Sequence, residues 1–376
     1  MSDPVIDLNI KFVPDNVAIW RIYPGTKKDF VKQFIKDECV FLELPGLDLE
    51  KGDLRGRVKI DPKIAKSKAL AEWYLSNPKD RKSQPSSNVA DYIDNYNKRS
   101  VGSSYSNFER LFKKAKVGDI VVVPEESGFQ SKLYIGEIVS EYSVDDSIAV
   151  RQFGIHKVPF RKVKWLRVDF EKRHVPVDLS YQLRGRRTVR SVSVDDYGLY
   201  IFRQAYQNFV FKEQGQMLFE GPAYDNDPET AIPGIIVLQY ALAAANAKVL
   251  GHERELSLRS FDQLRKSSYR RHDVLSFEMS FASPGSYRVW HGSVRALLLA
   301  LALVAVAGTD LSASEAQKAV VQNDQSQGLS AHVIKVREDY KDLMESITPR
   351  EFERLKEERK KAENGVGFKE RTKVKK

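Results

Sequence analysis

The stretch VGDIVVVPEESGFQSKLYIGEIVSEY, residues 117–142, holds two apolar segments separated by a polar one. The Gly118-Asp119 pair favours a turn into IVVVP, and LYIGEIVSEY has the length and β-branched content of a second strand. The intervening EESGFQSK has the composition of an exposed loop. We therefore predict a hairpin whose apolar residues are core. We expect it to support the preceding segment, YSNFERLF, rather than to bind a ligand itself.

The sequence around this hairpin predicts further short strands and a few helices. Strands are expected in NVAIWRIYPG, IAVRQFGIHKV and RKVKWLRVDF, and helices in TKKDFVKQFIKDECV, KIAKSKALAEWYLSN and SNFERLFKKAK. The last of these helices has Ser106 as a candidate N-cap. Short strands with closely spaced turns are typical of a small barrel. We predict a small β-barrel with peripheral helices over this region.

The second half of the chain has a different pattern, which begins after the arginine-rich LRGRRTVRS. Residues in HDVLSFEMSFASPGSY alternate between apolar and polar, as in a half-buried strand, and ALLLALALVAVA is an apolar helix. We predict an α+β chain with three parts. Residues 1–193 form the barrel domain, 195–345 an α+β domain in which helices cover a sheet, and 346–376 a charged helix that becomes a disordered basic tail.

Composition points to a polyanionic partner in a reducing compartment. The 376 residues carry a formal net charge of +10, which suits nucleic acid or an anionic membrane surface. Cys39 is the only cysteine, so a disulfide framework is excluded. The N-terminus MSDPVIDLNIKF lacks the pattern of a signal peptide. These features favour a cytoplasmic protein, and we expect Cys39 to be a small buried residue.

Motifs for catalysis, cofactors and metals are missing from the sequence. We find no GxGxxG, GxxxxGK[ST], HExxH or CxxC, and the six histidines are scattered without ligand spacing. We therefore predict no catalytic residue, no cofactor and no metal site.

A dense basic segment runs from Arg151 to Arg190. It has twelve Lys and Arg against three Asp and Glu, with aromatic residues interleaved. Cations beside aromatic faces suit phosphate contact and base stacking. The alternative is a solvated basic face around a barrel whose aromatic residues are core. The candidate phosphate contacts are Arg161, Lys162, Lys164, Arg184, Arg186 and Arg187.

Six segments occur in an order that resembles a known family. They are IWRIYPG, DFVKQFIKDECVFLELPGLDL, SNFERLFKKAKVGDIVVVP, LYIGEIVSEY, HKVPFRKVKWL and RTVRSV. Residues 17–193 resemble the PUA/EVE-like N-terminal domain of prokaryotic restriction and defence proteins of the Mrr and McrB type. The resemblance implies a small barrel that holds a base or a modified base in an aromatic-lined pocket. The acid-x-acid-Lys core of the nucleases fused to such domains is not found downstream.

By this resemblance, the pocket would be built from the first strand and from the segment before the Gly-Asp turn. Trp20 and Arg21 fall in the first, and Tyr105, Asn107 and Phe108 in the second. Trp20 and Tyr105 could stack on a base while Asn107 reads its edge. The alternative is that Trp20 and Phe108 are barrel core and that Asn107 belongs to the helix N-terminus after the Ser106 cap.

The leading hypothesis is a nucleic-acid-binding protein of the prokaryotic defence type. Its N-terminal domain would recognise DNA or RNA, with a modified base as one candidate, and its C-terminal domain would form a homo-oligomer or act as an effector. One alternative is a nuclease with an unrecognised metal site among Asp195, Asp196, Asp225, Asp227 and Glu229. Another is a membrane-acting effector that uses the apolar helix at 294–307, although this helix is too short to span a bilayer alone.

Overall fold

The computed structural model of this chain is an α+β structure with three sheets. It describes residues 3–25, 30–81, 83–125, 131–184, 187–222, 228–251, 263, 276–280, 285–291, 293–325 and 331–375. The chain divides into two compact units, one of residues 16–205 and the other of residues 1–15 together with 206–376. Each unit is described by itself.

The first unit, residues 16–205, contains a sheet in the order β4-β8-β6-β5-β3-β9, with β7 paired to β8. Only β3 and β5 pair in parallel. The strands are β3 (Ile19–Ile22), β4 (Cys39–Phe41), β5 (Ile120–Pro124), β6 (Lys132–Ile138), β7 (Ser147–Ala149), β8 (Lys157–Glu171) and β9 (Val189–Val192).

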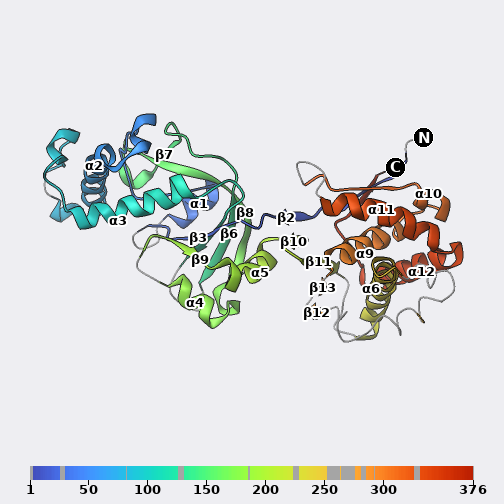
Figure 1. Cartoon of the computed structure of the whole chain (residues 1–376). Coiled ribbons are helices and arrows are strands. Elements are labelled where there is room, and N and C mark those ends of the chain that lie inside the picture. The colour runs from blue at the N-terminus through green and yellow to red at the C-terminus, as the bar shows by residue number, and fades with distance from the viewer. Residues whose placement is uncertain are drawn as a thin grey trace. The chain divides into compact units, whose positions relative to one another are not determined.

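Five α-helices accompany this sheet in the described residues. They are α1 (Val31–Lys36), α2 (Arg57–Leu75), α3 (Lys98–Phe108), α4 (Val177–Leu183) and α5 (Val194–Ala205). Helices α2 and α3 are in contact (Figure 1), and α3 continues into a π-helical turn, Glu109–Lys114. Buried side chains of α1, α2, α3 and the strands form one apolar core, in which Phe34 and Phe108 are fully buried.

The predicted hairpin is confirmed: β5 and β6 pair antiparallel, with Ile120 opposite Glu137 and Pro124 opposite Leu133. Every residue of β5 is buried. Part of the predicted loop, residues 126–130, lies outside the described residues. The described strands do not form the closed barrel that was predicted. Closure requires the two edge strands to pair with each other, but β4 pairs with β8 and β9 pairs with β3, so the described sheet stays open.

The second unit contains two sheets, in the orders β14-β1-β15 and β12-β13-β11-β10-β2. Both sheets include a strand from the first fifteen residues, because β1 lies between β14 and β15 and β2 pairs with β10. The strands are β1 (Val5–Asp7), β2 (Lys11–Val13), β10 (Phe209–Phe211), β11 (Gln214–Gly221), β12 (Ser276–Ser280), β13 (Gly285–His291), β14 (Val320–Gln322) and β15 (Lys373–Lys375).

Among the described helices of the second unit, α6 (Pro228–Val249), α11 (Ala331–Ser346) and α12 (Pro349–Val366) pack against α9 (Val294–Ala307), as Figure 1 shows. The short helix α10 (Ala313–Gln317) contacts α11 and α12. Helix α9 contacts α6, α11 and α12 as well as strands of both sheets, and all its residues except Arg295 are buried. This agrees with the prediction of a core helix. Ser293 caps α9 by accepting a hydrogen bond from the amide of Ala296.

One described helix passes the length and apolarity test for a membrane span. This is the Ile232–Val249 part of α6, of which 67% is buried inside the unit. Core helices pass the same test, and here α6 packs against α9 and α12.

Three parts of the predicted domain division differ from the structure. Helix α5 belongs to the 16–205 unit and not to the predicted 195–345 domain. Residues 1–15 belong to the second unit and not to the 16–205 unit, because their strands pair with β10, β14 and β15. The segment 346–376 is a helix, as predicted, but its end is not a disordered tail: β15 pairs antiparallel with β1, with Val374 opposite Ile6. Local composition misses the last two facts, since they depend on pairing between strands about 200 to 370 residues apart.

Cys39 is fully buried in β4, as predicted. Burial raises the pKa of its thiol to about 12, and the nearby Asp37 acts in the same direction. The thiolate is the reactive form of cysteine, so this residue is inert in the folded protein.

Candidate functional site

Two adjoining pockets lie between α2, α3 and the residues just before β9. The first has a volume of about 430 Å³ and the second about 510 Å³. Four residues line both pockets, so they form one continuous groove: Lys68, Ser104, Asn107 and Thr188. The first pocket, here called the base end of the groove, also includes Leu42, Glu43, Leu44, Ala71, Glu72, Leu75 and Ser76. The second, here called the cationic end, also includes Asn97, Arg99, Ser100, Ser103 and Arg187.

Helical spacing places one wall of the groove on α2 and another on α3. Lys68, Ala71, Glu72 and Leu75 are spaced three or four residues apart and therefore share one face of α2, and Ser76 is its C-cap residue. On α3, the lining residues follow the same spacing: Ser100, Ser103, Ser104 and Asn107. The α3 helix begins at Lys98. The preceding residue, Asn97, caps it by accepting a hydrogen bond from the amide of Ser100. The predicted N-cap, Ser106, is instead inside the helix.

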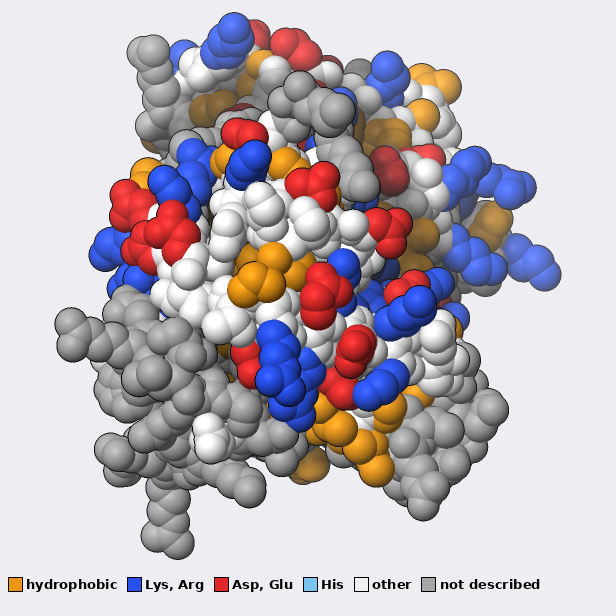
Figure 2. All heavy atoms as spheres, turned by 90° about the vertical axis from the view of Figure 1, so that its right-hand side faces the viewer, with side chains coloured by type: hydrophobic (Ala, Val, Ile, Leu, Met, Phe, Trp, Pro, Cys, Tyr) orange, Lys and Arg blue, Asp and Glu red, His pale blue; other side chains and the backbone are white. Residues whose placement is uncertain are grey.

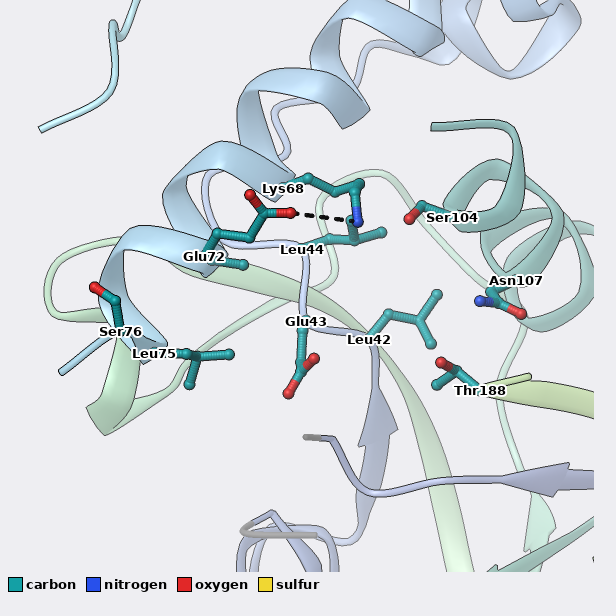
Figure 3. Close-up of a pocket in the computed structure, with 11 residues that line it drawn as sticks. Leu42, Glu43, Leu44, Lys68, Glu72, Leu75, Ser76, Ser104, Asn107 and Thr188 are labelled. Carbon is teal, nitrogen blue, oxygen red and sulfur yellow. Dashed lines mark ion pairs between the residues drawn. The ribbon is translucent and has the colours of Figure 1, made fainter. Parts of the chain in front are cut away.

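Asn107 has an orientation fixed by one hydrogen bond. Its Oδ1 accepts from the backbone amide of Val189 at 3.2 Å. A backbone N–H can only donate, so the amide oxygen must face β9 and the Nδ2 group faces the other way. Figure 3 shows this nitrogen on the side of the pocket, near Leu42 and Thr188. Asn107 therefore presents a hydrogen-bond donor to the groove.

The third wall of the groove, Arg187 and Thr188, is held by side chains from β3 and the residue after it. The guanidinium of Arg21 donates to the carbonyl oxygens of Leu183 and Arg187, and Tyr23 donates from its hydroxyl to Leu183 at 2.9 Å. The amide of Tyr23 also donates to the carbonyl of Thr188. Arg21 is fully buried, and this desolvation lowers its pKa. Arg21 positions the groove wall but lines neither pocket.

The groove has a positive end and a mixed end. Lys68, Arg99 and Arg187 line the cationic end together with seryl, threonyl and asparaginyl groups, and no carboxylate lines it. The base end contains Glu43 and Glu72 in addition to Lys68. Lys68 and Glu72 form a loose ion pair at 3.8 Å, drawn in Figure 3. Glu72 is exposed, Lys68 is partly buried, and an ion pair of this length is weak, so Lys68 can exchange this partner for an anion in the groove.

The whole net positive charge of the chain belongs to the unit that carries the groove. Residues 16–205 contain 35 Lys and Arg against 25 Asp and Glu, a net charge of +10. The other unit contains 26 of each and is neutral. Figure 2 views the molecule from the side on which α9 to α12 lie in Figure 1, and its described surface shows acidic and basic side chains interspersed. The net positive charge that would favour a polyanionic partner therefore lies in residues 16–205.

Of the five residues predicted to form a base pocket, Asn107 alone lines either described pocket. Trp20 is buried, and its Nε1 donates to Asp119 at 2.9 Å. Phe108 and Arg21 are fully buried. Tyr105 is 9% exposed, and its ring lies against the guanidinium of Arg57 and the ammonium of Lys113. The structure thus places Trp20 and Phe108 in the core, in line with the alternative stated for them, and it also buries Tyr105.

The predicted phosphate contacts fall in different places. Arg161 is 1% exposed and donates to the carbonyl oxygens of Leu111, Ala115 and Ser140, so the prediction that it contacts phosphate is wrong. Arg187 lines the groove. The remaining described residues of this set are exposed but line neither pocket: Lys162, Lys164 and Arg184. Arg186 lies outside the described residues.

Sequence reasoning missed Lys68, Arg99 and the serines of α3. The serine spacing in RSVGSSYSN was the available signal, because it places a polar stripe on one face of a helix. Lys68 and Arg99 are single cations in ordinary helical sequence, and only the packing of α2 on α3 brings them together.

The described residues contain no group of three His, Cys, Asp or Glu side chains able to hold a metal ion. Asp195 and Asp196 are exposed in the first turn of α5, and nothing is described for the side chains of Asp225, Asp227 and Glu229. No family model, curated protein or solved structure matches the chain.

Proposed function

We propose that residues 16–205 bind nucleic acid through the groove between α2, α3 and Thr188. The observation that carries the proposal is the cationic end, where Lys68, Arg99 and Arg187 surround hydroxyl and amide groups in the unit that holds the whole net charge. Arginine and lysine side chains neutralise phosphates, while hydroxyl and amide groups complete the hydrogen bonds to phosphate oxygens.

The resemblance to PUA/EVE-like domains gives the finer form of this proposal. It supports recognition of DNA or RNA, with a modified base as one candidate, by a protein of the prokaryotic defence type. In this scheme the neutral unit, residues 1–15 and 206–376, mediates homo-oligomerisation or an effector step. A mixed surface charge suits contacts with another protein better than contacts with a polyanion.

The test is binding of the full-length protein to fluorescent single-stranded and duplex DNA and RNA, with and without modified bases. Anisotropy is measured at two salt concentrations. We expect binding to at least one class, with an affinity that falls steeply as salt rises, because phosphate contacts release counterions. Absence of salt-sensitive binding to every probe would refute the proposal.

Substituting Asn107 with aspartate should weaken nucleic-acid binding several-fold while the fold is retained. The new carboxylate can still accept the hydrogen bond from Val189, but it loses the Nδ2 donor and repels phosphate. Asn95→Asp is the matched control, because Asn95 is exposed in the same unit and lines neither pocket. Equal losses in the two variants would indicate a general charge effect and would remove Asn107 from the site.

A further inference from the structure

We infer that the base end of the groove takes a single unpaired nucleobase that carries an exocyclic amino group, such as cytosine. This inference rests on the proposed function and adds the class of base. A pocket of about 430 Å³ has room for one nucleobase with part of its sugar, and it opens directly into the cationic end through Lys68, Ser104, Asn107 and Thr188.

The walls of the base end suit a flat ring. Leu42, Leu44, Ala71 and Leu75 supply apolar surface from the segment after β4 and from α2, and Figure 3 shows the two walls on different sides of the pocket. Leu42 and Leu44 are almost fully buried and therefore fixed in position. Apolar side chains that pack against a ring face favour a base over a phosphate at this end.

The distribution of charge along the groove sets the direction of a bound nucleotide. Both lining carboxylates, Glu43 and Glu72, are at the base end, whereas Arg99 and Arg187 are at the other. A phosphate is repelled by the first pair and attracted by the second. The phosphate therefore lies against Arg99 and Arg187, and the base points toward Glu43 and Glu72.

Hydrogen-bonding capacity then separates the bases. An ionised carboxylate can only accept hydrogen bonds, so Glu43 and Glu72 suit a donor such as the N4 amino group of cytosine. The Nδ2 group of Asn107 is a donor and suits the O2 or N3 acceptors of the same base. Uracil presents a carbonyl oxygen in place of the amino group, and this oxygen would face the carboxylates without a proton between them.

The test compares full-length protein binding to single-stranded dC12 and dU12, which differ at this position of the ring and not in a methyl group. We expect dC12 to bind at least about fivefold more tightly, within the discrimination usual for one good base contact. In Glu43→Gln/Glu72→Gln, whose amides can donate as well as accept, the dC12 to dU12 ratio should fall below about twofold. The ratio of the dC12 and dU12 affinities is informative because the loss of two negative charges strengthens binding to both oligonucleotides.

The matched control is Glu38→Gln/Glu141→Gln, which changes the same charge at two exposed positions outside both pockets and should keep the dC12 preference. Equal, salt-sensitive affinity of the wild type for dC12 and dU12 would overturn this inference and leave the proposed function standing. A dC12 preference that survives in Glu43→Gln/Glu72→Gln would also overturn it. Absence of binding to both oligonucleotides and to every probe in the wider panel would refute the inference and the proposed function together.

Discussion

Replacing Arg99 and Arg187 together with alanine is expected to weaken binding of single-stranded oligonucleotides by about tenfold or more at low salt. Both side chains are exposed and line the cationic end of the groove. Loss of two phosphate contacts should also lower the slope of log affinity against log salt by about 1.4 for a single strand. Anisotropy titrations across a salt series measure both quantities.

The control for this pair is Arg350→Ala/Lys360→Ala on α12. It removes the same charge from exposed positions of the neutral unit and should leave both affinity and salt slope close to the wild-type values. If the control weakens binding as much as Arg99→Ala/Arg187→Ala, binding follows total charge and the groove has no special role. Circular dichroism of each variant checks that the fold is retained.

Arg161→Ala is expected to destabilise the protein by about 3 kcal/mol or more, the usual cost of breaking a buried, hydrogen-bonded charge arrangement. The guanidinium ties Leu111 and Ala115, at the end of the π-helical turn, to Ser140 after β6. Its removal leaves three carbonyl groups of the 16–205 unit without this donor. Urea unfolding followed by tryptophan fluorescence measures the change in the free energy of unfolding.

Lys162→Ala is the matched control, because Lys162 is the next residue of β8 and is exposed. We expect a change within about 0.5 kcal/mol for this variant, as for most surface substitutions. At a temperature where Arg161→Ala is still folded, its oligonucleotide affinity should equal that of the wild type. An Arg161→Ala protein as stable as the wild type would show that the three hydrogen bonds of this guanidinium contribute little to the free energy of unfolding.

The elements that sequence could predict are those with a strong local pattern. The hairpin of β5 and β6 follows from a run of β-branched residues after a Gly-Asp turn, and α9 follows from a continuous apolar run with a serine cap. In both cases, the residues that favour the element locally are also the residues that are buried in the core, so local propensity and tertiary packing agree.

The groove could be predicted only in part, because distant contacts decide which polar side chains face outward. Arg161 and Arg187 both lie in the basic segment 151–190, yet carbonyl groups from two other segments enclose Arg161 while Arg187 faces the groove. Trp20 has an aromatic ring of the kind that stacks on bases, but its indole N–H donates a hydrogen bond to Asp119 within the core. Asn107, one of the five residues predicted for a base pocket, lines the groove, and its hydrogen-bond partner Val189 is 82 positions away.

The position of β1 between β14 and β15 has a consequence for synthesis of the chain on the ribosome. The first strand emerges more than 300 residues before the partners that flank it, Val320–Gln322 and Lys373–Lys375. At roughly 5–20 residues per second, it waits on the order of 15–60 s for them. Residues 16–205 have all their own strands available during that interval. Translation therefore delivers a complete 16–205 unit well before the second unit has all its strands.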